Sequence, residues 1–215
     1  GTTYLVGQRQ TSVGDYGFNE RGFVVRVYEN SCYMEYSFNE YEEVEELAAE
    51  ITGTLKKELS AMEALGIEKL EAPLIHEEKM EKTMNGEIGE DPMAVSPEEI
   101  LARLKKISDT GAEGKFVIDF RVAAQFAYVN KLFLSEKKDL MQTYAFAEGM
   151  AAAIGADGEK QDMIFRGFSG LKGAELLDEI GGTVDELLKL LDEKLHADPV
   201  VPGMYDVITA PEVTG

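Results

Sequence analysis

Apolar and polar residues alternate in short runs over the first 38 residues of the chain. Thr2–Gln10, Phe23–Tyr28 and Cys32–Phe38 are rich in β-branched and aromatic residues, and Gly, Asn and Asp lie between these runs. Such runs, separated by turn-forming residues, are typical of antiparallel strands. We therefore predict strands in all three stretches.

The period changes at residue 39, where apolar residues begin to recur at three- and four-residue spacing. This spacing builds one apolar face on a long helix over residues 39–65. Asn39 and Glu42 predict an N-cap and capping box, and Gly66 predicts the C-terminal exit. The residues of the apolar face are Val44, Leu47, Ala48, Ile51, Leu55, Met62 and Leu65.

A second helix is predicted from Ser96 to the segment Asp109–Gly111. Ser96 is an N-cap residue, Pro97 occupies the first helical position, and Glu99 occupies the third. Between the two helices, residues 67–95 contain prolines, glycines and many charges, and they predict an irregular linker or surface excursion.

From Lys115 the apolar residues alternate again, which predicts a long strand containing Phe120 and Val122. We expect a turn at Asn130-Lys131, a further strand over Leu132–Leu134, and a second turn within Glu136–Asp139. Residues 140–153 fit either a helix or a strand on pattern alone. Gly155–Gly158 predicts another turn, and Asp162–Phe168 predicts the returning strand of a meander.

The last long apolar pattern, residues 171–196, is helical with a break at Gly181-Gly182. Thr183 and Glu186 repeat the capping-box spacing. Two prolines and a glycine follow, and Tyr205–Ile208 predicts a short strand. The buried candidates of the helix are Leu187, Leu188, Leu190, Leu191 and Leu195. The fold class is therefore α+β: an antiparallel sheet, in part a meander, packed with long amphipathic helices.

Charge and cysteine content narrow the classes of partner. The formal net charge of −20 opposes binding to a phosphate backbone, so we expect no direct contact with nucleic acid. No apolar run approaches the length of a membrane span, so no membrane contact is expected. The single cysteine, Cys32, fits a reducing cytoplasm, and we interpret it as a small strand residue rather than a reactive thiol.

Candidate catalytic chemistry is sparse. His76-Glu77 does not extend to a zinc-protease motif, because Met80 and Glu81 stand where the second histidine would be. We interpret His76 as a surface residue and His196 as a residue of the last helical turn, where positive charge is favoured. No catalytic, cofactor-binding or metal-ligating residue is assigned.

Two further polar residues have structural interpretations. Arg26 lies between two valines and is expected on the solvent side of its strand. Phe168-Ser169-Gly170 lacks the glycine spacing of a nucleophile elbow and is interpreted as a turn-like fragment.

Several segments resemble the TldD/PmbA family of candidate modulators of DNA gyrase and metallopeptidases. Residues 199–215, which include Pro202-Gly203-Met204-Tyr205-Asp206-Val207, are similar to the family segment that leads into the metal-binding helix. Gly22–Tyr28 resembles an early family strand, and Tyr128–Leu134 resembles a strand, turn, strand element, which favours strand over helix for residues 140–153.

The resemblance implies a domain organisation and a role. Residues 1–198 would form the N-terminal α+β domain, and residues 199–215 the first strand of a catalytic domain. In one branch of the family that domain carries a His-Glu-x-x-x-His zinc motif, which would lie beyond residue 215, and in the other branch the ligands are absent. The ending Pro211–Gly215 is more similar to the metal-bearing branch. The chain itself would be inactive. It would pair with a homologous subunit, as a homodimer or heterodimer, and help to enclose peptides or unfolded proteins for proteolysis.

A second function class stays open, namely a stand-alone acidic module for protein binding or assembly, without enzymatic activity. An exposed sheet edge or apolar patch would serve such a module.

Overall fold

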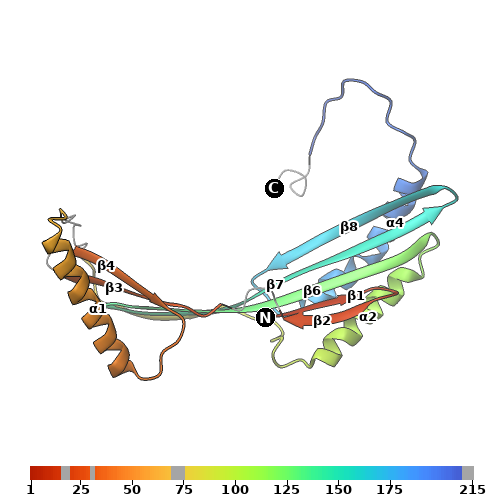
Figure 1. Ribbon diagram of the computed structural model, residues 1–215. Coiled ribbons are helices and arrows are strands. Elements are labelled where there is room, and N and C mark those ends of the chain that lie inside the picture. Colours follow the sequence, from red (N-terminus) through yellow and green to blue (C-terminus); the bar gives the residue numbers. More distant parts are fainter. Residues whose placement is uncertain (16–19, 30–31, 69–75, 210–215) are drawn as a thin grey trace. The chain divides into compact units, whose positions relative to one another are not determined.

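The computed structural model describes residues 1–15, 20–29, 32–68 and 76–209. Its elements form an α+β fold, as predicted (Figure 1). The chain divides into two compact units. Unit 1 contains Asp15–Asn85 and Asn130–Thr143, and unit 2 contains Thr2–Gly14, Gly86–Val129 and the chain from Tyr144 onward.

Unit 1 contains a hairpin covered by a helix. Strands β3 (Phe23–Glu29) and β4 (Cys32–Phe38) pair antiparallel, which confirms the two predicted strands. Helix α1 (Val44–Ala64) packs its apolar face on the hairpin. The buried residues of this small core are Met34, Ile51, Leu55 and Leu59, and the half-buried residues around them are Val25, Val27, Tyr36, Phe38, Leu47 and Met62.

The start of α1 was predicted wrongly, although its end was predicted correctly. The helix begins at Val44, after Glu43, whose side chain makes no cap hydrogen bond, so Asn39 does not cap it. The Tyr41 ring, which precedes the helix, packs edge-on against Phe23 of the hairpin, with ring centroids 5.4 Å apart. Gly66 has a φ of 64°, the left-handed conformation expected of a C-terminal glycine.

The predicted linker over residues 67–95 contains a strand, which is a correction. Strand β5 (Met80–Asn85) pairs in parallel with residues 138–143 of β7 (Lys138–Asp157). All six β5 residues are exposed, and the charged Lys82 separates its two apolar residues, Met80 and Met84, on the same face. The sequence therefore shows no apolar alternation to detect. Residues 69–75 of the predicted linker lie outside the described residues.

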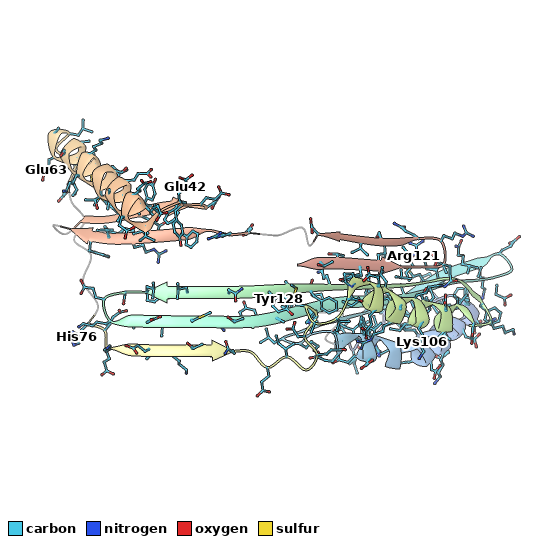
Figure 2. The ribbon with its side chains drawn as sticks, turned by 90° about the horizontal axis from the view of Figure 1, so that it is seen from below. Glu42, Glu63, His76, Lys106, Arg121 and Tyr128 are labelled. Carbon is cyan, nitrogen blue, oxygen red and sulfur yellow. The ribbon has the colours of Figure 1, made fainter. Side chains whose placement is uncertain are left out.

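The last part of the predicted linker, residues 86–95, belongs to unit 2. The Glu175 carboxylate accepts hydrogen bonds from the backbone N–H groups of Gly89 (3.1 Å) and Glu90 (2.8 Å). Burial opposes ionisation of Glu175, but the backbone donors outweigh it and hold the pKa of this carboxyl below its usual value. Arg103 donates to Glu90 (2.6 Å), and the hydroxyl of Tyr128, the residue labelled in Figure 2, contacts Asp91.

Strand β6 (Val117–Leu134) passes through Asn130-Lys131 without the predicted turn. Thr143 of β7 donates a hydrogen bond to the Asn130 side chain (2.9 Å), a contact between the two strands. The chain turns at Ser135–Lys137, which overlaps the second predicted turn, and the Ser135 N–H donates to the Lys138 carbonyl there (2.8 Å). Residues 140–153 belong to β7, so the prediction of a strand there is confirmed.

The main sheet has the strand order β2-β1-β6-β7-β5, and β8 also pairs with β7. Strand β1 (Thr2–Val6) pairs antiparallel with β6, and β8 (Lys160–Gly170) pairs antiparallel with β7, which confirms the returning strand. Strand β2 (Thr11–Asp15), whose five residues are all exposed, was not predicted.

Helices α2 (Pro97–Ala112), α3 (Leu176–Gly182) and α4 (Val184–His196) pack with this sheet in unit 2 (Figure 1). The predicted cap of α2 is confirmed, because the Ser96 hydroxyl accepts from the Glu99 N–H (3.2 Å). The predicted break after α3 is also confirmed. Thr183 does not form a capping box, because its hydroxyl donates to the Ile180 carbonyl (2.8 Å).

The core of unit 2 depends on small residues in β7. An added Cβ at Gly149 would lie 2.7 Å from Ile180 Cδ1 of α3, and one at Gly155 would lie 2.7 Å from Leu191 Cδ2 of α4. Helix side chains therefore pack directly on the strand backbone. The remaining small residues on this side of β7 are Ala145, Ala147, Ala151 and Ala153, all of them buried.

The predicted strand over Tyr205–Ile208 does not form. Residues 197–209 lie in no helix or strand, and the side chains of Met204 and Ile208 are fully exposed. A strand requires a hydrogen-bonding neighbour. None of the described strands provides one here. Residues 210–215 lie outside the described residues.

The Gly111→Ala variant should destabilise unit 2. Gly111 lies inside α2, where an added Cβ would be 2.2 Å from Cγ of the fully buried Phe120 ring. Overpacking of this kind costs about 1–3 kcal/mol. Urea unfolding followed by circular dichroism measures the loss. The matched control is Gly182→Ala in α3, where the new methyl group meets nothing within 4 Å and should be neutral or stabilising by about 0.5 kcal/mol. Equal effects of the two variants would contradict the packing described.

Candidate functional site

Two of the polar residues weighed from the sequence lie on the surface of unit 1. Arg26 is exposed and its Nε donates to Glu35 Oε2 at 2.9 Å, so the predicted solvent-side position is confirmed. His76 is exposed and precedes β5 (Figure 2). The backbone of Cys32 belongs to β4, but its side chain lies outside the described part of the molecule, so its interpretation stays a prediction.

His196 lies in the last turn of α4, as predicted, and its ring contacts Asp192 and Asp157. Its Nδ1 lies 2.8 Å from the Asp192 carbonyl oxygen, and its Nε2 lies 3.0 Å from Asp157 Oδ2. The Asp192 carbonyl contributes most, and the Asp157 carboxylate next, to raising the pKa of this imidazole above 6.5. The ring also packs against Phe116, with centroids 5.0 Å apart.

The described residues do not form a site for the zinc ion that the sequence resemblance implies for the full-length protein. Both His196 nitrogens already contact oxygen atoms within α4 and β7. Across the described residues, no three His, Cys, Asp or Glu side chains are placed to hold a metal ion together. Zinc sites need three or four such ligands, so no metal chemistry is assigned to the described residues.

A cavity of about 460 Å³ opens on the sheet of unit 2. It is lined by Thr3, Ala123, Ala124, Gln125, Glu148, Gly149, Met150, Gly167, Phe168 and Ser169. These residues come from β1, β6, β7 and β8. Ser169 therefore lies within a strand and lines a cavity, which corrects the prediction of a turn-like fragment.

Four polar side chains form a row across this cavity, one from each strand. Thr3 stands opposite Gln125 in the β1–β6 pairing, and Glu148 stands opposite Ser169 in the β7–β8 pairing. The Gln125 amide donates a hydrogen bond to Glu148 Oε2, which joins the two halves of the row. Directly opposed residues share one face of a sheet. We call these four residues the polar row.

The sequence contained no signal for this row. Thr3, Gln125, Glu148 and Ser169 are far apart along the chain and match no motif. Only the strand register brings them together. A prediction of the strand pairing would have been needed to find them.

None of the described helices is both long and apolar enough to cross a membrane.

Comparison with known proteins shows the fold of the chain. No protein-family model matches the sequence, and no curated protein matches it. A candidate modulator of DNA gyrase from Thermotoga maritima is similar in structure, with a TM-score of 0.62 and 16% identity over 87% of this chain. One from Bacteroides thetaiotaomicron has a TM-score of 0.51 and 15% identity over 93% of this chain.

These similarities confirm, at the level of the fold, the resemblance found in the sequence. The chain has an α+β fold shared with proteins described as candidate modulators of DNA gyrase. It spans less than half of their length, 41% and 44% respectively.

The Asp157→Asn variant should lower the pKa of His196. The imidazolium is stabilised in the folded chain, so its contribution to stability is complete below pH 6.5 and is lost as pH rises through the folded-state pKa. Titration of the His196 ring protons by NMR measures the pKa in both chains. The Glu45→Gln variant, which removes one charge from α1 of unit 1, is the control. A pKa at or below 6.5 in the unaltered chain would contradict the geometry.

Proposed function

We propose that the chain is the N-terminal, non-catalytic portion of a TldD/PmbA-like metalloprotease subunit that acts in the cytoplasm. Its role is assembly with a second subunit of the same fold and enclosure of peptides or unfolded proteins for hydrolysis. Residues 1–198 form the domain with this role, and residues 199–215 lead into the catalytic domain. Zinc and its ligands belong to the part of the subunit beyond residue 215.

The shared fold supports the first part of this proposal. Similarity extends over 87% of the chain but less than half of the Thermotoga maritima protein. The segment after α4 carries the sequence resemblance to the family. Residues 197–209 lie in no helix or strand and are exposed, which is compatible with a connecting segment.

The observation that best supports an assembly role is an uncovered apolar surface on unit 1. Successive residues of a strand point to opposite faces, yet Leu132, Phe133 and Leu134 of β6 are 65%, 50% and 63% exposed. Both faces of this strand segment therefore present large apolar side chains. Met80 and Met84 of β5 are about half exposed as well.

Such surfaces are uncommon on soluble monomers and typically mark interfaces. Met and Phe side chains are also enriched at protein interfaces. We call Met80, Met84, Leu132, Phe133, Leu134 and Met141 the apolar end, since all six residues lie in the paired β5, β6 and β7 segments of unit 1.

The chain should self-associate through the apolar end, and the Leu132→Lys/Leu134→Lys double variant should remain monomeric. Burying a leucine contributes about 1.5–3 kcal/mol, so losing two from each copy should weaken the dimer by more than about 100-fold. Sedimentation equilibrium over a concentration series measures the change.

The matched control is Leu65→Lys, which replaces an exposed leucine beyond α1. It should associate as the unaltered chain does. If the unaltered chain sediments as a monomer at every accessible concentration, assembly with a second copy is contradicted.

The chain with added zinc should not hydrolyse a denatured protein substrate. The described residues offer no metal-holding group, and the family motif is absent from the sequence. Release of fluorescence from labelled, unfolded casein measures hydrolysis, with a chelator-treated sample as the control. Chelator-sensitive cleavage by the purified chain would overturn the non-catalytic assignment.

A further inference from the structure

The polar row contains a carboxylate, Glu148, whose described partner is a neutral side chain. The Glu148 carboxylate is half-buried in the cavity wall, and its described hydrogen-bond donor is the neutral Gln125 amide. Two other partly covered carboxylates of unit 2 contact cations: Glu90 contacts Arg103 at 2.6 Å, and Asp119 contacts Arg121 at 2.7 Å. A third, Glu175, accepts hydrogen bonds from two backbone N–H groups, whereas Glu148 has one described neutral donor. No ion pair joins Glu148 to a described lysine or arginine.

The chemistry around Glu148 favours a cation on an aliphatic stem. An ionised carboxylate has about four lone-pair sites, so Glu148 can accept further donors beyond Gln125. The hydroxyl groups of Thr3 and Ser169 line the same cavity. Ala123 and Met150 provide apolar wall beside them. Methylene stems of basic side chains pack well on such surfaces while their charged heads form ion pairs.

The net charge of the whole chain also favours binding of a cation. A net charge of −20 attracts cations at long range and raises their local concentration. The cavity, at about 460 Å³, has ample room for one lysine or arginine side chain. Long-range attraction alone is unselective, so selectivity must come from the carboxylate and the cavity walls.

We propose that the cavity over the polar row binds one basic side chain, an ammonium or guanidinium group on an aliphatic stem, presented by a peptide. Glu148 forms the ion pair, Thr3 and Ser169 supply hydroxyl oxygens as acceptors, and Met150 packs against the stem. This site goes beyond the proposed function and does not depend on it. A chain that fails to self-associate could still bind the side chain.

The experiment is a titration of the chain, labelled with ¹³C at its methionine methyl groups, with the peptide acetyl-Ala-Ala-Lys-Ala-Ala-amide. The Met150 methyl resonance should shift saturably, whereas that of the fully exposed Met204, which is not a lining residue, should not. The same peptide with norleucine in place of lysine tests the ammonium group. Spermidine tests whether the basic group requires a peptide.

Two variants remove the site in different ways. Glu148→Gln keeps the shape and removes the charge, and binding should weaken at least tenfold. Gly167→Leu keeps the charge and fills the cavity: a Cβ at Gly167 meets nothing within 4 Å, so the new side chain enters open space. It should also weaken binding at least tenfold. Glu159→Gln, at the exposed β7–β8 turn, removes the same charge and should change affinity less than twofold.

Each alternative outcome overturns the proposal. Equal weakening by Glu148→Gln and Glu159→Gln would mean general attraction to an acidic chain. Equal binding of the norleucine peptide would mean an apolar site. Binding of spermidine without binding of the lysine peptide would mean a site for free polyamines. Unchanged binding in Gly167→Leu would place the ligand elsewhere.

Discussion

The close approach of helices α3 and α4 to strand β7 is the contact on which unit 2 depends. Ile180 and Leu191 occupy the space where side chains at Gly149 and Gly155 would stand. These leucine and isoleucine side chains are buried to within about one percent of full coverage. Burial of each contributes about 1.5–3 kcal/mol, so the absence of side chains on the strand is compensated by complete burial of those on the helices.

The same strand builds the cavity, because its side chains alternate between two faces. Ala147, Gly149 and Ala151 face the helices, and Glu148 and Met150 between them line the cavity. The small residues therefore have two consequences. They let the helix layer pack directly on β7, and the firmly held strand fixes the polar row on its other face.

The elements whose two faces differ could be predicted from the sequence. Helix α2 has a cap, a first-turn proline and one apolar stripe, and β6 has alternating Phe120 and Val122, so both were predicted. Strands β2 and β5 could not be predicted in this way, because their residues are all exposed and show no alternation. Strand β7 contains many small residues such as Ala151, and this composition fits a helix as well as a strand. Only the family resemblance favoured the strand.

The polar row could not be predicted from the sequence for a different reason. Histidine and cysteine are the residue types most often found in catalytic and metal sites, and the chain has His76, His196 and Cys32. His76 is a surface residue, however, and His196 contacts the backbone of α4 in its last turn. The polar row consists of common residue types, and strand register alone brings Glu148 and Ser169 together.

The central claim is that helix side chains rest directly on the backbone of β7. Nuclear Overhauser spectroscopy tests it without altering the chain. The account predicts cross-peaks from the Gly149 α-protons to the Ile180 δ-methyl group, and from the Gly155 α-protons to the Leu191 methyl groups. Absence of both cross-peaks, with those glycine protons contacting water instead, would contradict it.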